Sequence, residues 1–469
     1  MPAVADRVQP PLAFIPPTFN PAVFRLARWL LPWVMRSRTP IHQVQASHVE
    51  KLAKLFQQFQ AGKLRFLIAF RHPSTSDPFC LMHLLWKLLP QVAREHNISL
   101  SQPTHSHFMY DRGVPLWAGA QVAWLFPQLG GTPIHRGKLD LPGLRSARDL
   151  FANGQFPLAA APEGATNGHN EIISPLEPGI SQLGFWCVED LQKAGRSESV
   201  AIVPLGIRYR YVEAPWDAVD NLLTQLETDS GLTSDPSNDD IPADRLQQLS
   251  GREAALYRRL YRIGEHLLSA MEQFYSRFYR ASKPSAAKAS AAAEPAATDL
   301  ATRLQTLLES ALQVAEEYFG LRPKGSLIDR CRRLEQAGWD RIYREDLKNI
   351  EALSPLERGL ANRIAEEASL RMWHMRLVES FVAVTGQYVL EKPTVERFAE
   401  TALLLWYTMT RIKDGNPFSP PRLGKQKADL TVGDPIVVSD RWEAYKKSRR
   451  QAVAQLTQDL QTALEATIG

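Results

Sequence analysis

Short apolar runs alternate with helical patterns over residues 44 to about 216, and this alternation is typical of an α/β domain. Three runs are interpreted as strands: RFLIAF (65–70), FPLAAA (156–161) and VAIVPLGIRYRYV (200–212). Two segments are interpreted as helices: PFCLMHLLWKLL (78–89) and LPGLRSARDLFANG (141–154). The second helix should end at Asn153-Gly154, because glycine after the last periodic residue is a common helix stop.

The pattern changes at about residue 217, and helical periodicity dominates from there to about 426. One long segment has apolar residues three and four positions apart, so one face of a helix should be buried. Those residues are Leu256, Leu260, Ile263, Leu267, Met271, Phe274 and Phe278. An Ala/Pro/Ser-rich stretch near 282–298 has nothing large to bury and is interpreted as a flexible linker. The residues Ser354 to Glu357 combine a capping box with a proline and predict a helix start.

The tail (428–469) shows the strand-and-helix pattern of the α/β domain again. It has a short strand at about 431–438, a Gly-Asp-Pro turn and an amphipathic helix. One side of this helix carries Val453, Leu456, Leu460 and Leu464. The tail is too short to bury a core by itself, so its strand should join the same sheet as the strand at 200–212. The predicted fold class is therefore α/β, a sheet flanked by helices, with a large all-helical insertion before the last strand and helix.

The predicted organisation has four parts: an N-terminal segment (1–43), the α/β domain (44–216), the helical insertion (217–427) and the return to the α/β domain (428–469). The first part contains FNPAVFRLARWLLPWVMRSR (19–38), in which Trp29 and Trp33 are flanked by arginines. This composition is typical of a helix that lies in a membrane interface, and Pro32 should limit its length. A surface helix packed on its own domain is the alternative. We expect peripheral binding to anionic membranes rather than a spanning helix.

Composition narrows the possible partners and compartments. A hydrophobic share of 44% suits a globular core, and a net charge of +5 fits an anionic lipid surface or substrate without requiring one. Three widely spaced cysteines argue against a disulfide framework and a zinc site and favour a reducing cytoplasm. No apolar stretch has the length of a spanning helix, and early prolines interrupt any secretory signal. We expect no metal and no nucleic-acid partner.

The stretch FLIAFRHPSTSDPF (66–79) places a histidine and an aspartate five residues apart. Such a spacing does not put two side chains on one helix face, so His72 and Asp77 can meet only if the chain turns between them. The intervening proline and serines are compatible with a turn. In one interpretation His72 is a catalytic base oriented by Asp77. In the other, Asp77 only caps a helix that begins at Pro78.

Four short motifs follow one another along the chain: His-x-x-x-x-Asp after a strand, Gly-x-x-x-x-Arg, Pro-Glu-Gly, and a Val-Pro pair on a strand. The residues are His72 and Asp77, Gly131 and Arg136, Pro162 with Glu163 and Gly164, and Val203 with Pro204. In this order they resemble the motifs of the glycerolipid acyltransferase family, the PlsC-like lysophosphatidate acyltransferases. A turn at 433–436 looks like the family's late Gly-Glu-Pro-Ile turn. The resemblance covers about 44–216 and 428–469 and leaves the helical insertion unexplained.

The resemblance implies an acyltransferase-type sheet and direct acyl transfer from a thioester carrier, acyl-CoA or acyl carrier protein, to a lysophospholipid such as 1-acylglycerol-3-phosphate. It implies that His72 is the general base, that Asp77 orients it, and that no acyl-enzyme forms. Arg136 would clamp an acceptor phosphate, because guanidinium presents a planar fork of donors. Glu163 and Gly164 would form part of the acceptor site. No cofactor beyond the acyl carrier, a co-substrate, is implied.

One position departs from the family pattern. Thr166 stands where the third motif has a phosphate-binding arginine. A phosphate on the acceptor would then be held by Arg136 and neutral donors alone, or the acceptor is a different, non-phosphorylated lipid. Two further alternatives are a catalytically altered lipid-binding scaffold and a peripheral hydrolase that uses His72 as a base toward water. The presence of both His72 and Asp77 argues against the scaffold, whereas the altered third motif argues for it.

Overall fold

The computed structural model describes residues 7–114, 118–135, 140–232, 246, 249–279, 300–347, 349–381 and 387–468. The chain separates into two units. The sheet unit comprises Ala13–Glu213 and Gly424–Gly469, and the helical unit comprises Met1–Leu12 and Ala214–Leu423.

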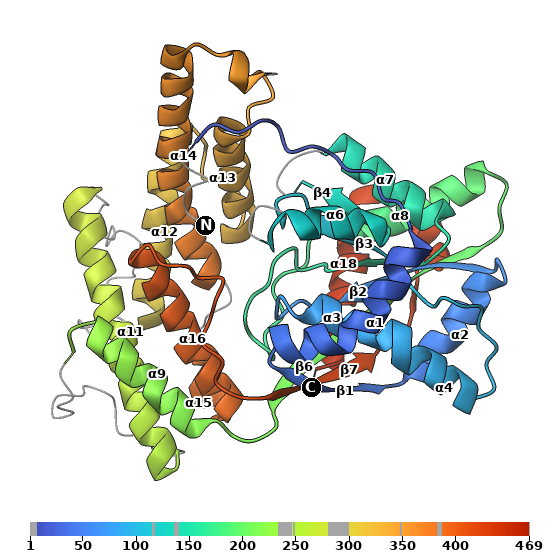
Figure 1. The fold of residues 1–469 in the computed structure, drawn as a ribbon, viewed down its shortest axis with the longest axis horizontal. Helices are drawn as coiled ribbons and strands as arrows, with labels where there is room; N and C mark the ends of the chain where they lie inside the picture. The colour runs from blue at the N-terminus through green and yellow to red at the C-terminus, as the bar shows by residue number, and fades with distance from the viewer. Residues whose placement is uncertain are drawn as a thin grey trace. The chain divides into compact units, whose positions relative to one another are not determined.

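An eight-stranded mixed sheet forms the centre of the sheet unit (Figure 1), in the order β1-β7-β6-β2-β5-β3-β4, with β8 also paired to β6. The strands β6, β2, β5, β3 and β4 are parallel to one another, whereas β7 and β8 run antiparallel to β6. The bounds are β1 Ile41–Ser47, β2 Leu64–Phe70, β3 His107–Asp111, β4 Gly131–Ile134, β5 Leu158–Ala160, β6 Ser199–Tyr211, β7 Gln426–Val432 and β8 Ile436–Val437.

The central strand β2 shows why the run at 66–70 is continuously apolar. Every residue of β2 is buried, because helices cover both faces of the sheet. Phe66, Ile68 and Phe70 belong to one apolar cluster, while Leu67 and Ala69 belong to the other. Successive side chains of a strand point to opposite faces, so one short sequence supplies both cores.

Two helical layers enclose the sheet. The first apolar cluster lies under α1 (Pro21–Arg38), α2 (Val49–Gln60) and the continuous run of α3 (Asp77–His83), the π-helix η1 (Leu84–Leu88) and α4 (Leu89–Glu95). The second lies under α7 (Leu141–Asn153), α8 (Gly179–Lys193), α17 (Trp442–Lys447) and α18 (Arg449–Ala466). The short helices α6 (Ala120–Gln128) and η3 (Ser439–Arg441) complete the unit.

The predicted strands and helices of this unit are present. The strand predicted at 156–161 is shorter, and the helix predicted at 78–89 begins at Asp77 and continues through η1 and α4 to Glu95. The helix α7 ends at Asn153, as the Asn153-Gly154 signal predicted. Pro32 does not limit the first helix, because α1 runs through it from Pro21 to Arg38.

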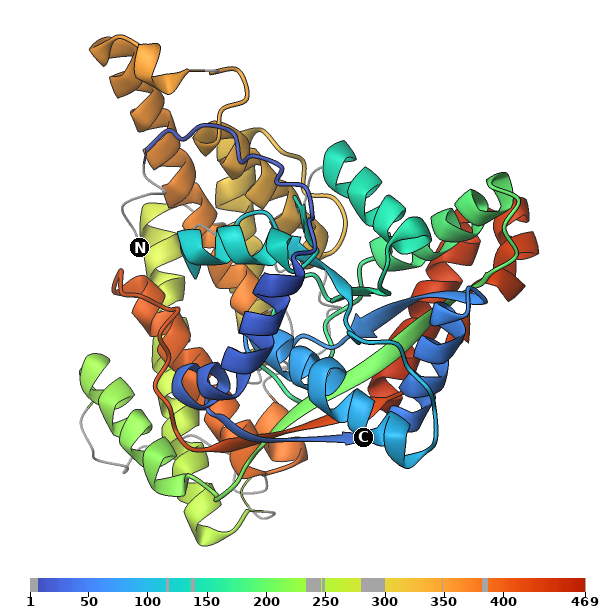
Figure 2. The same ribbon diagram turned by 45° about the vertical axis from the view of Figure 1, so that its right-hand side comes forward.

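The prediction that the tail strand joins the sheet is confirmed. β7 pairs antiparallel with β6, from Leu205 opposite Val432 to Tyr211 opposite Gln426. Figure 2 shows the red β7 between the green β6 and the blue β1, although β7 comes much later in the chain. The pairing region starts earlier than predicted, and the turn at 433–435 leads into the separate strand β8. The helix α18 buries its predicted apolar side in the second cluster: Val453, Leu456, Leu460 and Leu464.

The described part of the helical unit consists of helices and connecting segments. They are α9 Trp216–Asp229, α11 Gly251–Phe278, α12 Leu300–Phe319, α13 Leu327–Ile342, η2 Ile350–Ala352, α14 Pro355–Phe381, α15 Tyr388–Glu391 and α16 Val395–Ile412. Ser354 and Glu357 form the predicted capping interactions at the start of α14. The predicted linker near 282–298 lies outside the described residues.

The buried face of α11 departs from the predicted one in its second half. Leu256, Leu260, Ile263 and Met271 are buried as expected, together with Leu268 and Tyr275, whereas Phe278 is 64% exposed. In the second half of α11, Leu268 and Tyr275 are buried one position after the predicted Leu267 and Phe274, which are only partly buried. Among the described residues, none of the helices has both the length and the apolar character needed to cross a membrane.

Candidate active site

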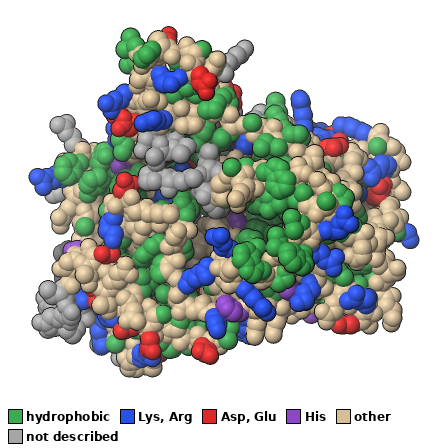
Figure 3. All heavy atoms as spheres, viewed as in Figure 1, with side chains coloured by type: hydrophobic (Ala, Val, Ile, Leu, Met, Phe, Trp, Pro, Cys, Tyr) green, Lys and Arg blue, Asp and Glu red, His purple; other side chains and the backbone are tan. Residues whose placement is uncertain are grey.

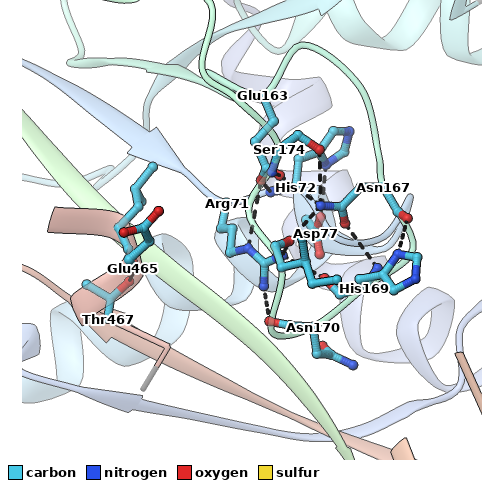
Figure 4. A network of polar contacts seen from close by, with 12 residues as sticks. Arg71, His72, Asp77, Glu163, Asn167, His169, Asn170, Ser174, Glu465 and Thr467 are labelled. Atoms are coloured by element: carbon cyan, nitrogen blue, oxygen red, sulfur yellow. Dashed lines mark hydrogen bonds and ion pairs between the residues drawn. The ribbon is translucent and has the colours of Figure 1, made fainter. Parts of the chain in front are cut away.

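The chain turns sharply at the end of β2 and brings His72 against Asp77. Arg71 N–H donates to the carbonyl of Leu205 at 2.9 Å and extends the pairing of β2 with β6 by one residue. The helix α3 then begins at Asp77. His72 Nδ1 lies 2.9 Å from Asp77 Oδ2, and the histidine side chain is 23% exposed while the aspartate side chain is completely buried. Figure 4 shows the two side chains facing each other.

Each oxygen of the Asp77 carboxylate has donors. Oδ2 accepts from His72 Nδ1 and from the backbone N–H of Ser74 at 2.9 Å, and Oδ1 accepts from the hydroxyl of Tyr209. An ionised carboxylate only accepts, so His72 carries its proton on Nδ1 and presents a free lone pair on Nε2. This is the tautomer that a general base needs. The capping interpretation does not describe this carboxylate, because α3 begins at Asp77 itself and has no side-chain cap bond at Ser76.

Glu163 joins the loop after β2 to the β5–α8 loop, residues 161–178. Its fully buried carboxylate accepts from the backbone N–H of His72 at 2.8 Å and from that of Ser174 at 3.0 Å. The side-chain amide of Asn167 donates to it at 3.1 Å, and Arg71 Nε lies 3.8 Å away. Burial raises the pKa of Glu163 above its usual value, although Arg71 and the backbone donors oppose this effect. The resemblance assigned Glu163 to the acceptor, but the contacts of its carboxylate are with the protein.

Arg71 is fully buried beside Glu163 and organises the same loop. Its guanidinium donates to the carbonyl of His169 at 2.6 Å and also to those of Asn170 and Ile172. The sequence analysis did not select Arg71. A signal was present, since a buried charge must be paired, and an arginine that directly follows the apolar run 66–70 is in a position to be buried.

Tyr209 and Asn170 were also missed. Tyr209, on β6, reaches Asp77 with its hydroxyl, and its backbone N–H donates to Asn170 Oδ1 at 2.7 Å. Both residues lie far from the His-x-x-x-x-Asp motif in sequence. The pairing of β6 with β2 brings Tyr209 to the site, and the β5–α8 loop brings Asn170.

The other residues of the third motif are placed by the β5–α8 loop. Gly164 has φ +71°, in the left-handed region that favours glycine. Thr166 is exposed, so the position that carries an arginine in the family presents a neutral side chain here.

Arg136 lies outside the described residues, but both sides of its segment are described. β4 ends at Ile134, and the backbone N–H of His135 donates to Asp140 Oδ2 at 2.8 Å. Asp140 also pairs with Arg112 and caps α7 through Gly143 N–H. Because β2, β5 and β4 are parallel, their carboxyl ends share one edge of the sheet, the usual place for a ligand in such folds. The first and third motifs follow β2 and β5 at this edge, and the second motif begins on β4, at Gly131.

The fourth motif packs against the late turn. Val203 and Pro204 lie on β6, opposite Ile68 and Ala69 of β2. Gly433 N–H donates to the Pro204 carbonyl at 2.9 Å. A Cβ at Gly433 would lie 2.7 Å from Pro204 Cγ, so only glycine fits this approach.

The residues that the structure describes offer no evident group for metal ligation or for thiol chemistry. Among the described residues there is no cluster of three His, Cys, Asp or Glu side chains that could hold a metal ion. Cys80, Cys187 and Cys331 are free and buried. Burial raises the pKa of the Cys187 thiol to about 12, which keeps it protonated and unreactive near neutral pH. The chemistry that the geometry offers is proton transfer at His72.

Neither a scan against models of known protein families nor a search of curated proteins found a match to this chain.

Proposed function

We propose that this chain is an acyltransferase that moves a fatty acyl group from a thioester carrier, acyl-CoA or acyl carrier protein, to the hydroxyl of a lysophospholipid, with 1-acylglycerol-3-phosphate as the first acceptor to test. The observation that carries the proposal is the 2.9 Å contact between a partly exposed His72 and a buried Asp77 at the carboxyl edge of a parallel sheet. The ordered motifs named above supply the reaction class.

The reaction needs one base and no covalent intermediate. Nε2 of His72 takes the proton of the acceptor hydroxyl while the hydroxyl oxygen attacks the thioester carbonyl carbon. Asp77 stabilises the imidazolium that forms. The carbon–sulfur bond then breaks, and the leaving thiolate takes the proton back from His72. The acyl ester and the free thiol are the products, and the enzyme returns to its starting state.

Recognition of a phosphate would depend on few cations. Arg71 is completely buried and bonded to the β5–α8 loop, so it does not replace the arginine absent at Thr166. Arg136 is then the cation assigned to the phosphate. The exposed, neutral Thr166 favours one second candidate, transfer to a lipid acceptor without a phosphate.

The helix α1 has one side packed on its own domain and another side whose composition suits a lipid surface. Phe24, Leu31 and Met35 are buried in the first apolar cluster, so one face packs on the sheet unit. The opposite side exposes Leu26, Trp29 and Trp33, with the two indoles 75% and 63% exposed. Exposed arginines accompany them at 25, 28, 36 and 38, and the helix has no acidic residue. Figure 3 shows hydrophobic side chains ringed by Lys and Arg over α1. Indoles between arginines suit a membrane interface.

The position of α1 relates such a membrane to the dyad. Phe24 of α1 packs against Trp86 of η1 with ring centroids 5.0 Å apart, and α1 also contacts α3, the helix that begins with Asp77. A lipid surface bound by α1 would therefore lie beside the helix that carries the acid of the dyad, where a lysolipid acceptor is available.

The test is a thioester assay with purified protein, with and without lysolipid. We expect release of free thiol and a new diacyl product that depend on the lysolipid. His72→Ala should lower the rate by about 10² or more, as expected for loss of a general base. Asp77→Asn should also lower it, by favouring the wrong imidazole tautomer. His96→Ala, at an exposed histidine, is the matched control and should leave the rate unchanged.

Each result separates the candidates. Thiol release without a lysolipid would indicate a hydrolase, and lipid binding without thiol release would indicate a scaffold. Near-normal transfer by His72→Ala would contradict the catalytic role of the dyad.

A further inference from the structure

We propose that Tyr209 is a positioning residue of the His72–Asp77 dyad, whose hydroxyl holds Asp77 in place and sets how strongly that carboxylate supports the imidazolium form of His72. The effect of Tyr209 on the rate of acyl transfer rests on the proposed function. The effect of Tyr209 on the protonation of the His72 ring rests only on the contacts of Asp77 with Tyr209 and His72.

The contacts of the Tyr209 hydroxyl determine which group donates and which accepts in each of its hydrogen bonds. Its hydroxyl contacts Asp77 Oδ1 and lies 3.6 Å from Cys80 Sγ. The carboxylate can only accept, so Tyr209 donates to it, and the Cys80 thiol donates in turn to the phenol oxygen. Burial, and then the charge of Asp77, raise the pKa of Tyr209 well above its usual value. The phenol therefore remains a donor throughout the working pH range.

Tyr209 also holds the opposite side of the site through its backbone. Its N–H donates to Asn170 Oδ1 at 2.7 Å, and the carbonyl of Asn170 accepts from Arg71. The same loop carries Glu163, which accepts from the backbone N–H of His72. Tyr209 therefore contacts both parts of the dyad's surroundings. Its side chain holds Asp77, and its backbone holds the β5–α8 loop, which in turn contacts the backbone of His72.

The hydrogen bond to Oδ1 has a chemical consequence. A donor withdraws negative charge from a carboxylate, so Asp77 stabilises the imidazolium less than a carboxylate lacking that bond would. Without the phenol hydroxyl, Asp77 Oδ1 loses its donor. The carboxylate then keeps more of its negative charge and stabilises the imidazolium form of His72 more strongly.

The test uses the full chain with Tyr209→Phe, and with 3-fluorotyrosine incorporated at position 209. Tyr209→Phe should move the acid limb of the kcat/KM profile to higher pH by about half a unit to one unit, the size expected for one hydrogen bond. The fluorinated phenol is more acidic and a stronger donor, so it should move the limb to lower pH. It keeps the ring and the hydroxyl, and so gives an answer even if Tyr209→Phe does not fold.

Tyr445→Phe is the matched control. Tyr445 is also a buried tyrosine of the sheet unit, and its hydroxyl accepts from Gln182 at 2.8 Å, away from the dyad. Its loss should leave the acid limb in place even if it lowers the melting temperature. Equal limbs for the wild type and both Tyr209 variants, or an equal shift in Tyr445→Phe, would overturn the proposal.

A second readout separates this inference from the proposed function. The titration of the His72 ring, followed by NMR in histidine-labelled protein and identified with His72→Gln, needs no substrate. We expect it to move upward in Tyr209→Phe and downward with the fluorinated residue. If the ring titration moves as stated and no acyl transfer is found, the proposed reaction fails and the role of Tyr209 stands. If transfer is found and the ring titration does not move, the role of Tyr209 fails alone.

Discussion

The oxygens of Asp77 and Glu163 all accept hydrogen bonds from donors inside the protein. Asp77 is held by His72, Ser74 and Tyr209, and Glu163 by both adjacent loops. A buried carboxylate satisfied in this way keeps one orientation, because every rotation would leave an anionic oxygen without a donor. Of Asp77, Glu163 and His72, His72 alone has a partly exposed side chain.

Glu163→Gln tests the stabilising part of this arrangement. The substitution removes the charge opposite the fully buried Arg71, and breaking one side of a buried ion pair typically costs about 3 kcal/mol or more. We expect a loss of that order in the free energy of unfolding, measured by denaturant titration. Glu198→Gln is the control, because its partner Arg196 is partly exposed and such pairs contribute about 1 kcal/mol or less. Equal losses in the two variants would contradict the role given to Glu163.

The acceptor is tested at the two positions where the third and second motifs offer a phosphate contact. If the acceptor carries a phosphate, Arg136→Ala should raise its apparent KM about tenfold or more, because a charge-assisted bond is lost. Thr166→Arg should lower that KM. Kinetics with lysophosphatidate and with a phosphate-free lysolipid provide the measurement. An unchanged KM for Arg136→Ala on lysophosphatidate would favour the non-phosphorylated acceptor.

The sequence predicted best the strands that are buried on both faces and the helices that are buried along the whole of one side. The strand β2 and the helix α18 are examples, since their buried positions are apolar apart from Arg65 in β2. The strands β1, β3 and β4 were not predicted. β1 and β4 lie at the edges of the sheet, β1 alternates with polar residues, and β4 contains Pro133, which an edge strand tolerates. Their place in the sheet is set by pairing with neighbours rather than by their own composition.

The candidate site divides in the same way. The pair His72 and Asp77 could be predicted, because a short motif contains both residues and the turn between them. Arg71, Asn170 and Tyr209 could not, since their roles depend on contacts across the β5–α8 loop and across β6. Glu163 was selected through the motif, but its burial and its bond to the His72 backbone emerge only from the fold.

The helix α1 leads to a prediction about membranes. Trp29→Ser with Trp33→Ser removes the two exposed indoles without touching the buried face, and should weaken binding to anionic vesicles about tenfold or more. Binding of the wild type should also fall at high salt, because each nearby arginine contributes about 1 kcal/mol through a screened interaction. Co-sedimentation with phosphatidylglycerol-containing vesicles measures both effects.

Phe278→Ser is the control for exposed aromatic area. Phe278 is 64% exposed on α11, close to the 63% of Trp33, but it has no place on α1. Its removal should leave vesicle binding unchanged. Salt-independent binding, or equal binding by the double tryptophan variant, would count against an interfacial role for α1.

In the protein as a whole, each unit contains a buried histidine that links stability to pH. Burial lowers the pKa of His105, in the sheet unit, to about 4, and that of His374, in the helical unit, also to about 4. His105 accepts from Trp86 Nε1 at 3.0 Å and contacts the Leu129 carbonyl at 2.8 Å, so its neutral form fits its surroundings. An unfolded histidine binds a proton near pH 6.5, whereas these two resist it.

Stability should therefore be complete above about pH 6.5 and decrease as the pH falls toward 4. A shift of this size corresponds to about 3 kcal/mol for each histidine over the full range. Thermal melting at pH 7 and pH 5 should show the loss, and His105→Gln should reduce it. His96→Gln, at an exposed histidine, is the control. A melting temperature that is equal at both pH values would contradict this prediction.

The order of the strands also governs when the protein can fold during synthesis. β6 emerges from the ribosome before residues 214–423, and its partner β7 and the covering helix α18 emerge only after them. Until then, residues 205–211 of β6 present an open strand edge, and the second apolar cluster lacks Leu456, Leu460 and Leu464. Such late, long-range pairing is slow and leaves aggregation-prone surface exposed. A growing chain thus contains His72 and Asp77 long before it contains the finished sheet, and the open edge of β6 stays without its partner strand while the helical unit is translated.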